Sequence, residues 1–505
     1  MQQDMKRYIL ILAAAFAAFS CNLDRYPYSE VAENEYVKDA KSVNNLVIGA
    51  YNGLYDVLYV EWAMTELRTD NARMRVNASS SNETKLIEAL DQLVPASANA
   101  WVGDYWDASY VVVDRANKVL ANLDVVTDEA LRAQYEGEAK FLRSWMYFNL
   151  VRLWGPVFIV TKKTGADEAR HMQRSPVEDV WTLIEGDLQE IVDKQLLPET
   201  MPAASLGRAD LKAAKAMLAK VYMTHYKPGE EKYAAAAGLL KEVLTACGDP
   251  KTATELVPYA DIFSKEKEGN AEIILAVRYR SGNLGIGSPF TTLYAPINNA
   301  GSVAIGSPKH YNYPSDNIIS AFNANEGDVR KDVCLRESYI NKTTGEVVDN
   351  ANARYCNKFI DPDMTSEYDA ENDFPIIRLG DVMLLYAEIL NELQGPGDEA
   401  LQYLNAIRGR AGIPAYTLEA IPTKYQFREA VRSERRLELA FENQRFYDLL
   451  RWGTAVSTIN NFLASEPFYG AYSYVVNPIE EWQLLLPIPV SVKNINKDVA
   501  QNPGY

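Results

Sequence analysis

The chain has 505 residues, of which 48% are hydrophobic and 24% charged, which is the composition of a folded globular protein. Its 68 acidic residues against 51 Lys and Arg give a formal net charge of −17, which argues against nucleic acid or an anionic lipid surface as a partner. Tyrosine is unusually frequent, with 31 residues against 15 Phe and 8 Trp, so a surface that stacks on a polar ligand is conceivable.

The N-terminus has the order of a secretory signal peptide. Lys6 and Arg7 precede an apolar run over 8–19, and Ser20 and Cys21 follow. As a helix this run is about 18 Å long, which is too short for the roughly 30 Å hydrocarbon core of a bilayer. The tetrapeptide AFSC resembles the lipobox of bacterial lipoproteins, although Ala and Phe replace the usual Leu and small residue. The resemblance implies lipid attachment at Cys21; the alternative is an ordinary signal peptide cut after Ser20.

Beyond Cys21 no stretch of eighteen apolar residues occurs, so we expect the lipid anchor to be the only membrane attachment. The remaining cysteines are Cys247, Cys334 and Cys356. Three is an odd number, so at least one thiol is free. Cys334 and Cys356 are the only pair close enough in sequence to consider for a disulfide, and the sequence leaves that pairing open.

Helical periodicity dominates two long parts of the chain. The clearest helix is 129–154, where apolar residues recur at spacings of three and four until Gly155 and Pro156 end the pattern. Further helices are predicted over 176–192, with Ser175 as the N-cap, and over 210–222, 233–245, 378–393, 399–411 and 425–451. Short Gly and Pro turns between them indicate antiparallel pairs, so we expect tetratricopeptide-like helix pairs that form one curved scaffold.

Between about 247 and 375 the helical period fades and Gly, Asn, Pro, Ser and Tyr become frequent. Long irregular segments in a compact protein usually carry function. The strand signals are few: one strand over 272–278, and a short hairpin formed by 338–340 and 346–348. The predicted fold class is therefore all-α, with a loop-rich portion and little strand.

The sequence lacks the motifs of common catalytic and cofactor sites. Its three histidines, His171, His225 and His310, have no partner residues at metal-binding spacings, and no nucleophile elbow, phosphate-binding lysine loop or dinucleotide-binding glycine motif occurs. We therefore expect neither a metal nor a cofactor.

One acidic segment, 361–372, starts like a calcium loop. Its sixth position is Ser366 where Gly is needed and its twelfth is Asn372 where Glu is needed, which disfavours calcium. A glycosidase needs two carboxylates at a defined separation in space, and a sequence does not show that separation. A glycoside hydrolase therefore stays open as an alternative of a different class.

The segment 425–451 is rich in charges. Glu434 and Glu438 fall on the apolar face of this predicted helix, so they need partners. We expect arginines to supply them in an ion-pair network that connects two helices, and a catalytic role for this density of charge is the alternative.

Seven segments resemble the SusD/RagB family of outer-membrane nutrient-binding lipoproteins. They occur in the family's order and span most of the chain after the signal peptide. The segments are GEAKFLRSWMYFNLVRLWGPV at 137–157, SPVEDVWTLIEGDL at 175–188, GRADLKAAKAMLAKVYM at 207–223, FPIIRLGDVMLLYAEILNE at 374–392, ALQYLNAIRGRAGIP at 400–414, SERRLELAFENQRFYDLLRWG at 433–453, and LLPIPVSVKNINKDVAQNPGY at the end.

The resemblance implies an α-helical fold with four tetratricopeptide-like units and no catalysis. It implies a lipoprotein on the cell-surface side of the outer membrane that captures an oligosaccharide and delivers it to a SusC-like TonB-dependent transporter. Capture of a peptide or another nutrient in the same complex is the alternative within the family, and a helical scaffold that binds only protein is a third hypothesis. The implied division of the chain is a signal peptide over 1–20 and one domain over 21–505, with the scaffold mainly in 110–247 and 375–453 and the ligand-binding portion mainly in 60–105 and 248–374.

In starch-binding relatives, acidic, basic and aromatic side chains of the irregular segments bind the ligand. Sugar rings have apolar faces ringed by hydroxyls, so aromatic plates and hydrogen-bonding side chains suit them. Position by position, the resemblance implies the following ligand-binding residues: Asp70, Asn71, Arg73, Trp101, Tyr294, Tyr311 and Tyr313. For each aromatic the alternative is packing within the loops.

Overall fold

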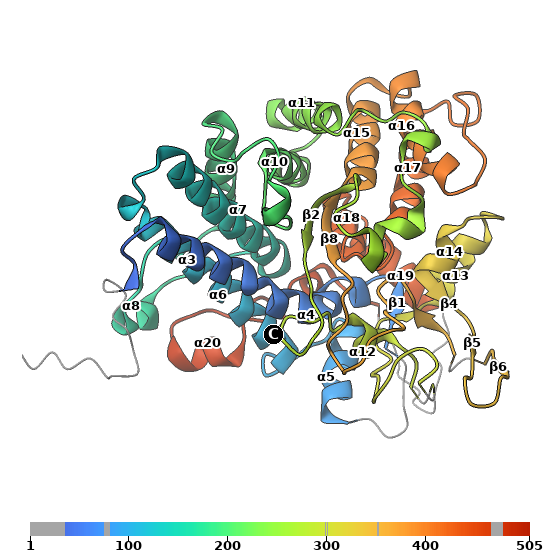
Figure 1. Ribbon diagram of the computed structural model, residues 1–505, viewed down its shortest axis with the longest axis horizontal. Helices are drawn as coiled ribbons and strands as arrows, with labels where there is room; N and C mark the ends of the chain where they lie inside the picture. The colour runs from blue at the N-terminus through green and yellow to red at the C-terminus, as the bar shows by residue number, and fades with distance from the viewer. Residues whose placement is uncertain (1–35, 75–80, 298, 300, 351–352, 466–477) are drawn as a thin grey trace, which may run out of the picture.

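A computed structural model describes residues 36–74, 81–297, 299, 301–350, 353–465 and 478–505. The lipobox with Cys21 lies outside these residues. The described chain is mainly helical, as the sequence predicts, and its few strands are short (Figure 1). None of the described helices is both long enough and apolar enough to cross a bilayer.

The long helices form a continuous array that sweeps across the molecule (Figure 1). Successive members pack pairwise, from α3 through α6, α7, α9 and α10 to α11, and then onto α15, α16 and α17. This arrangement is of the tetratricopeptide type that the helix pattern predicts. The bounds are α3 (Ala40–Asn52), α4 (Leu54–Met64), α6 (Ala100–Ala121), α7 (Glu129–Trp154), α9 (Val177–Asp193), α10 (Leu211–His225), α11 (Glu231–Ala246), α15 (Leu379–Gln394), α16 (Asp398–Arg410) and α17 (Lys424–Glu438).

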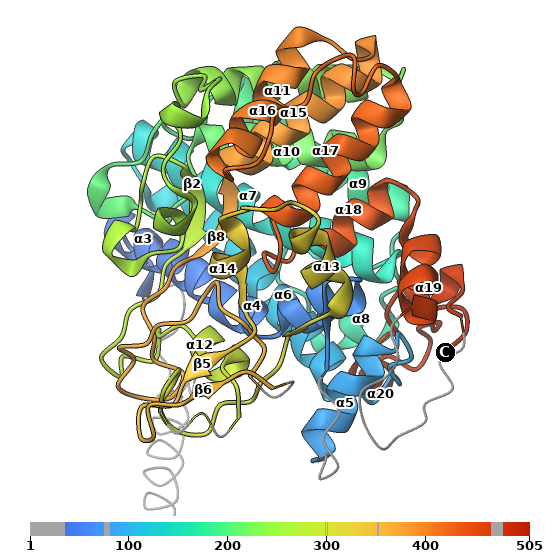
Figure 2. The same ribbon diagram turned by 90° about the vertical axis from the view of Figure 1, so that its right-hand side faces the viewer.

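Shorter elements cover the ends and one side of this array (Figure 2). The shorter α-helices are α5 (Asn82–Asp91), α8 (Ala166–His171), α12 (Phe290–Tyr294), α13 (Asp316–Asn323), α14 (Arg330–Cys334), α18 (Arg445–Arg451), α19 (Ala455–Ser465) and α20 (Val490–Ile495). Single 3-10 turns are η1 (Glu66–Arg68), η2 (Leu123–Val125), η3 (Ala203–Ser205), η4 (Ala253–Glu255), η5 (Tyr259–Ile262), η6 (Lys265–Lys267) and η7 (Glu481–Leu484).

The strands form separate antiparallel pairs. They are β1 (Ala72–Arg73) with β3 (Tyr313–Pro314), β2 (Ile273–Val277) with β8 (Phe374–Arg378), β4 (Leu335–Arg336) with β7 (Tyr355–Cys356), and β5 (Tyr339–Ile340) with β6 (Val347–Val348). The predicted strand over 272–278 and the predicted hairpin are thereby confirmed. Gly345 in the hairpin turn has a φ of +74°, which glycine adopts without steric cost.

Helix α7 shows how local sequence sets an element of the array. The side chain of Asp128 accepts a hydrogen bond from the backbone N–H of Leu131 at the N-terminus, and Gly155 with a φ of +70° ends the helix. Trp154 is buried, and its indole N–H donates to the carbonyl of Pro487 at 2.9 Å. The predicted bounds of this helix are confirmed.

Two local predictions are wrong. The segment 425–451 is two helices, α17 and α18, because Phe441 and Asn443 between them have φ values of +65° and +60° that no helix allows. The backbone N–H of Phe441 donates to the buried carboxylate of Glu66, which anchors this break. Helix α9 has Pro176 rather than Ser175 at its N-cap, without a side-chain cap.

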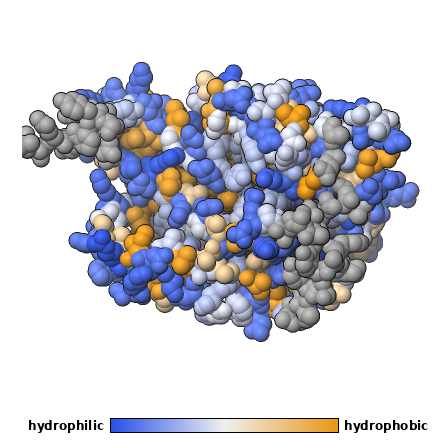
Figure 3. Space-filling model, turned by 90° about the horizontal axis from the view of Figure 1, so that it is seen from below, coloured by the Kyte–Doolittle hydropathy of each residue, from blue (hydrophilic) through white to orange (hydrophobic). Residues whose placement is uncertain are grey.

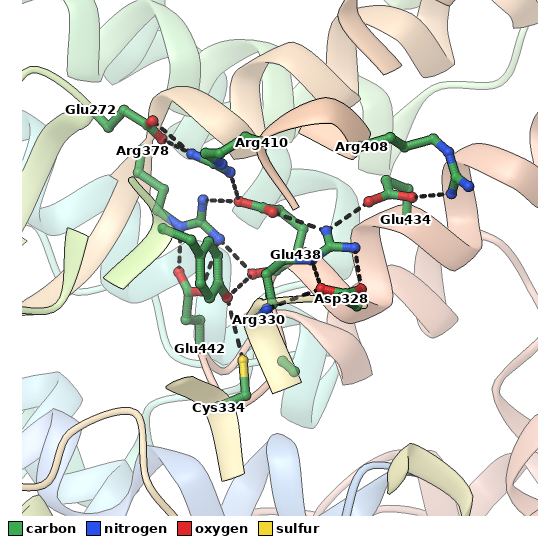
Figure 4. Close-up of polar contacts among 12 residues, drawn as sticks. Glu272, Asp328, Arg330, Cys334, Arg378, Arg408, Arg410, Glu434, Glu438 and Glu442 are labelled. Atoms are coloured by element: carbon green, nitrogen blue, oxygen red, sulfur yellow. Dashed lines mark hydrogen bonds and ion pairs between the residues drawn. The ribbon is translucent and has the colours of Figure 1, made fainter. Parts of the chain in front are cut away.

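The predicted ion-pair network is confirmed (Figure 4). Glu438 at the end of α17 accepts from Nη1 of Arg378 at 2.5 Å and from Nη1 of Arg330 at 3.1 Å, and it also binds Arg410. Glu434 binds Arg330 at 2.6 Å and Arg408 at 2.8 Å. These side chains come from α14, β8, α16 and α17 and are buried, so the network joins the loop-rich portion to the helices.

Cys334 and Cys356 are buried free thiols at the β4–β7 pair, and Cys247 is a partly exposed free thiol. The hydroxyl of Tyr259 lies 3.4 Å from Sγ of Cys334. The sequence left their pairing open, and in the structure neither buried thiol forms a disulfide.

Candidate ligand-binding site

Five aromatic side chains gather where α4, the start of α6 and two loops meet; we call them the aromatic cluster. They are Tyr59, Trp62, Trp101, Tyr311 and Tyr368. Tyr59 stacks on Trp101 with ring centroids 6.0 Å apart and 12° between the planes, and Trp62 stacks on Tyr311 at 5.5 Å. Tyr368 tilts against Tyr59 at 6.4 Å. Tyr59 and Tyr368 are partly exposed, so the cluster has an open edge.

Local hydrogen bonds fix the positions of Trp101 and Tyr311 in the cluster. Asn99 caps α6: its side chain accepts from the N–H of Trp101 at 3.1 Å and donates to the carbonyl of Leu86 at 2.7 Å, which holds Trp101 in the first turn beside α5. The N–H of Tyr311 donates to the carbonyl of Leu293 at 2.7 Å, so the loop lies along α12. The cluster is therefore held by backbone contacts on several sides.

Polar groups border the open edge. Glu83, in the first turn of α5, lies close enough to Tyr311 to influence its hydroxyl, and its carboxylate lies 3.7 Å from Nζ of Lys309. Burial, the nearby Tyr368 hydroxyl and the charge of Glu83 raise the pKa of Tyr59 to about 12, and burial with Glu83 also raises the pKa of Tyr311. Both phenols are therefore protonated at neutral pH and can donate hydrogen bonds.

The structure brings two of the residues that the resemblance implied into this cluster. Trp101 is 6% exposed and Tyr311 is 4% exposed, so each can offer a ligand only a ring edge in this conformation. Tyr294 is fully buried behind them, with its ring 6.0 Å from that of Trp62. Their contact with a ligand stays a prediction.

The other four implied residues lie outside the cluster and are buried in the fold. Asp70 accepts from Arg445 at 2.8 and 2.9 Å, and although burial alone would raise its pKa, Arg445 and Arg436 lower the pKa of Asp70 to about 2. Asn71 donates to Glu66 at 2.8 Å. These contacts tie the segment after α4 to α17 and α18.

Arg73 and Tyr313 pair across β1 and β3, and both are buried. The guanidinium of Arg73 lies 5.2 Å from the ring of Phe462, and the ring of Tyr313 lies 5.5 Å from that of His310. Both residues thus have packing partners within the fold. Their role in ligand binding, like that of Asp70 and Asn71, stays a prediction.

Sequence reasoning missed Tyr59, Tyr368 and Glu83, which form the open edge. A signal for the first existed: Tyr51, Tyr55 and Tyr59 recur every four residues, which places them on one helical face. For Tyr368 and Glu83 no local pattern distinguishes them from other loop and surface residues.

The acidic segment at 361–372 binds a lysine side chain from another part of the chain. Nζ of Lys265 lies 2.7 Å from Asp361 and 3.0 Å from Asp363, so an ammonium group neutralises the two carboxylates. Within the residues that the structure describes, no group of three or more His, Cys, Asp or Glu side chains is arranged to hold a metal ion.

Comparison with known proteins gives matches over almost the whole chain. A sequence model described as "SusD family" matches residues 272–505, and one described as "Starch-binding associating with outer membrane" matches residues 22–223. SusD-like protein P25 of Formosa agariphila is 26% identical and covers 100% of this chain and 99% of its own length. A SusD-like protein of Bacteroides ovatus is 25% identical over 79% of each chain.

Solved structures agree in fold. A laminarin-binding SusD-like protein superposes with a TM-score of 0.74 and 25% identity over 93% of this chain and 100% of its own. A SusD homolog from Bacteroides thetaiotaomicron superposes with a TM-score of 0.77 and 24% identity, over 95% and 99%. The surface glycan-binding protein A of the same organism, solved with laminarihexaose, has a TM-score of 0.73 and 21% identity over 92% and 99%.

Proposed function

Because the chain belongs to the SusD family, we propose that it is a glycan-binding protein that captures an oligosaccharide at the aromatic cluster without cleaving it. The observation that supports this site is the open edge formed by Tyr59 and Tyr368 over the Trp101 ring, with Glu83 and Lys309 beside it. Ring edges and faces suit the apolar side of a sugar, and protonated phenols, a carboxylate and an ammonium suit its hydroxyls.

The similar proteins support the ligand class. One solved relative at 25% identity is a laminarin-binding protein, and the N-terminal family description refers to starch binding. Both ligands are glucose polymers, so a glycan is the ligand class that we assign to this chain. A shallow site of this kind gains little beyond the cost of ordering the ligand, and we expect an affinity on the order of micromolar to millimolar.

The same proposal places the protein in an uptake complex. Lipid attachment at Cys21 would hold it on the outer membrane, facing the outside of the cell, and a SusC-like TonB-dependent transporter would receive the glycan. On the face seen in Figure 3, apolar residues lie in small groups among hydrophilic ones. This surface fits a protein that a lipid anchors and water surrounds.

Isothermal titration of the purified protein against a panel of polysaccharides and a peptide digest tests the proposal, with chromatography of the products in parallel. We expect binding of a glycan without cleavage, and loss of that binding in Trp101→Ala, Tyr311→Ala and Tyr59→Ala. Since Trp101 and Tyr311 are buried, Tyr59→Ala is the decisive variant, and thermal melting checks that each variant is folded. Tyr425→Ala is the matched control, because Tyr425 is exposed at the start of α17.

Each other result counts against the proposal. Cleaved products would favour the glycoside hydrolase alternative. A peptide signal with no glycan signal would favour peptide capture, and glycan binding that is equal in the Tyr59→Ala variant and the control would move the site away from the aromatic cluster.

A further inference from the structure

A groove opens beside the aromatic cluster, between α3, α4, the turn at Gly207 and the end of β2; we call it the tyrosine groove. Its volume is about 310 Å³, which is within the size range of ligand sites. It is lined by Ile48, Tyr51, Asn52, Leu54, Tyr55, Leu206, Gly207, Arg208, Val277, Arg278 and Ile286.

Hydrogen bonds fix the two tyrosines of the groove. The hydroxyl of Tyr55 donates to the carbonyl of Arg278 at 2.8 Å, and the hydroxyl of Tyr51 accepts from the N–H of Ala209 at 2.8 Å. The ring of Tyr55 also packs against that of Tyr279, with centroids 5.2 Å apart. Because each hydroxyl is held at the wall, the rings are preorganised as apolar plates, and a ligand would not have to order them.

The groove and the cluster share one helix face. Tyr55 and Tyr59 are four residues apart on α4, so their side chains lie on the same side of the helix, about 6 Å apart along its axis. Tyr51, at the end of α3, precedes Tyr55 by another four residues. The tyrosines of the groove therefore lead directly to the open edge of the cluster.

The opposite wall is continuous as well. The segment after β2 folds back through an isolated bridge between Arg280 and Ile286, and Ser288 then pairs with Ala370. A Cβ on Gly287 would lie 2.8 Å from the carbonyl oxygen of Tyr368, so the two segments touch there. Ile286 in the groove and Tyr368 in the cluster are thus held side by side.

Polar and apolar groups alternate around the groove. Ile48 is 52% exposed and Leu206 is 45% exposed. Arg278, whose side chain is 37% exposed, uses Nε and Nη2 for Asp373 and Glu268, which leaves Nη1 as a donor. Apolar surface with a few hydrogen-bonding groups is what the face and the rim of a pyranose ring require.

We propose that the tyrosine groove is a second sugar subsite, and that one oligosaccharide chain runs along α4 across the groove and the aromatic cluster. This inference rests on the proposed function, because it extends the same glycan site. It assigns a ligand class that is narrower than glycan in general: a chain long enough to contact Tyr55 and Tyr59 at once. A single sugar unit can occupy only one of the two subsites.

The test is titration with size-fractionated ladders of one to eight sugar units, prepared from a β-1,3-glucan, an α-1,4-glucan and a β-1,4-xylan. With the ladder that binds, we expect affinity to rise with chain length until both subsites are filled. Tyr55→Ala should weaken the longest chains by about three- to tenfold and leave the shortest bound chains unchanged. Tyr55→Phe, which keeps the ring and loses only the tether to Arg278, should stay within about twofold of the wild type.

Three outcomes would overturn the inference, and they differ from a failure of the proposed function. Affinity that is independent of chain length, or equal losses for short and long chains in Tyr55→Ala, would leave the aromatic cluster as the only subsite. The same loss in Tyr425→Ala would show a nonspecific effect of removing a tyrosine. If none of the ladders gives a binding signal, the result would refute glycan binding itself and therefore also the second subsite. Thermal melting of Tyr55→Ala confirms that the variant is folded.

Discussion

Replacing Glu438 by Gln is the sharpest test of how this fold is held together. The carboxylate is fully buried and binds three guanidinium groups, those of Arg330, Arg378 and Arg410. Glutamine has nearly the same shape, so the substitution removes the charge and leaves no cavity. Each of the three arginines then keeps other carboxylate partners but loses the one that they share.

The size of the effect follows from the local charges. The connected carboxylates are Glu272, Asp328, Glu434, Glu438 and Glu442, and the connected cations are Arg330, Arg378, Arg408, Arg410 and Lys358. The signs balance, so Glu438→Gln leaves one buried positive charge without compensation. Removing one partner of a buried ion pair costs about 3–5 kcal/mol, and we expect the free energy of unfolding to fall by this amount.

Urea unfolding followed by tryptophan fluorescence measures the loss. Glu429→Gln on the same helix is the control: its side chain is 46% exposed and pairs with Arg432 at 3.2 Å, so it should cost less than about 1 kcal/mol. Burial would raise the pKa of Glu438, but Arg410, Arg378 and Arg330 hold it well below the usual 4.5. The stabilisation is therefore present above about pH 4.5 and decreases as the pH falls. Equal losses in the two variants would refute the reasoning.

Three further predictions concern other parts of the fold. Gly207→Ala should destabilise the protein by about 1–3 kcal/mol in urea unfolding, because Gly207 has a φ of +90° and a Cβ there would lie 2.7 Å from Cγ of Arg278; an unchanged midpoint would contradict this. Burial raises the pKa of Glu61 to about 7, so the wild type should lose stability relative to Glu61→Gln as pH rises from about 4.5 to 7, by up to about 3 kcal/mol; a difference that does not vary with pH would contradict it. Iodoacetamide should modify Cys247 in the native protein and reach Cys334 and Cys356 only after unfolding, as measured by mass spectrometry, because both are buried and burial raises the pKa of each thiol. Labelling of all three cysteines at equal rates in the native protein would contradict the burial of Cys334 and Cys356.

Local sequence predicts the elements whose signals are local. Helix α7 ends where Gly155 ends its apolar period, and the turn at Gly345 joins β5 and β6 as expected. The break between α17 and α18 could not be predicted, because a hydrogen bond from Phe441 to Glu66, which is distant in sequence, stabilises it. The long-range partners of Glu434 and Glu438 could nevertheless be anticipated from the sequence. An acidic residue on the apolar face of a helix needs a buried partner, because burying an unpaired charge is costly.

The candidate site was predicted only in part for the same reason. Trp101 and Tyr311 follow from the family resemblance, and the structure places both in the aromatic cluster. Tyr59, Glu83 and Tyr368 meet them only because α4, α5 and the loop before β8 pack together. No pattern within a short stretch of sequence indicates that these three residues come together. The exposed part of the cluster could therefore be identified only from the three-dimensional structure.

The pairing of β2 with β8 has a consequence for how such a protein can change. Val277 faces Phe374 across the pair, so the long segment 278–373 between them leaves the strand pair and returns to it at neighbouring points; we call this segment the excursion. Its length can grow or shrink without moving either anchor, since loop-closure entropy increases only slowly with length. The excursion carries Tyr311, Tyr368 and Ile286, whereas Tyr51, Tyr55 and Tyr59 belong to the helices. A new excursion grafted at β2 and β8 would therefore meet an unchanged row of tyrosines, provided that it keeps Asp328, Arg330 and Lys358, whose charges balance those of Glu434, Glu438 and Glu442 in and just after α17.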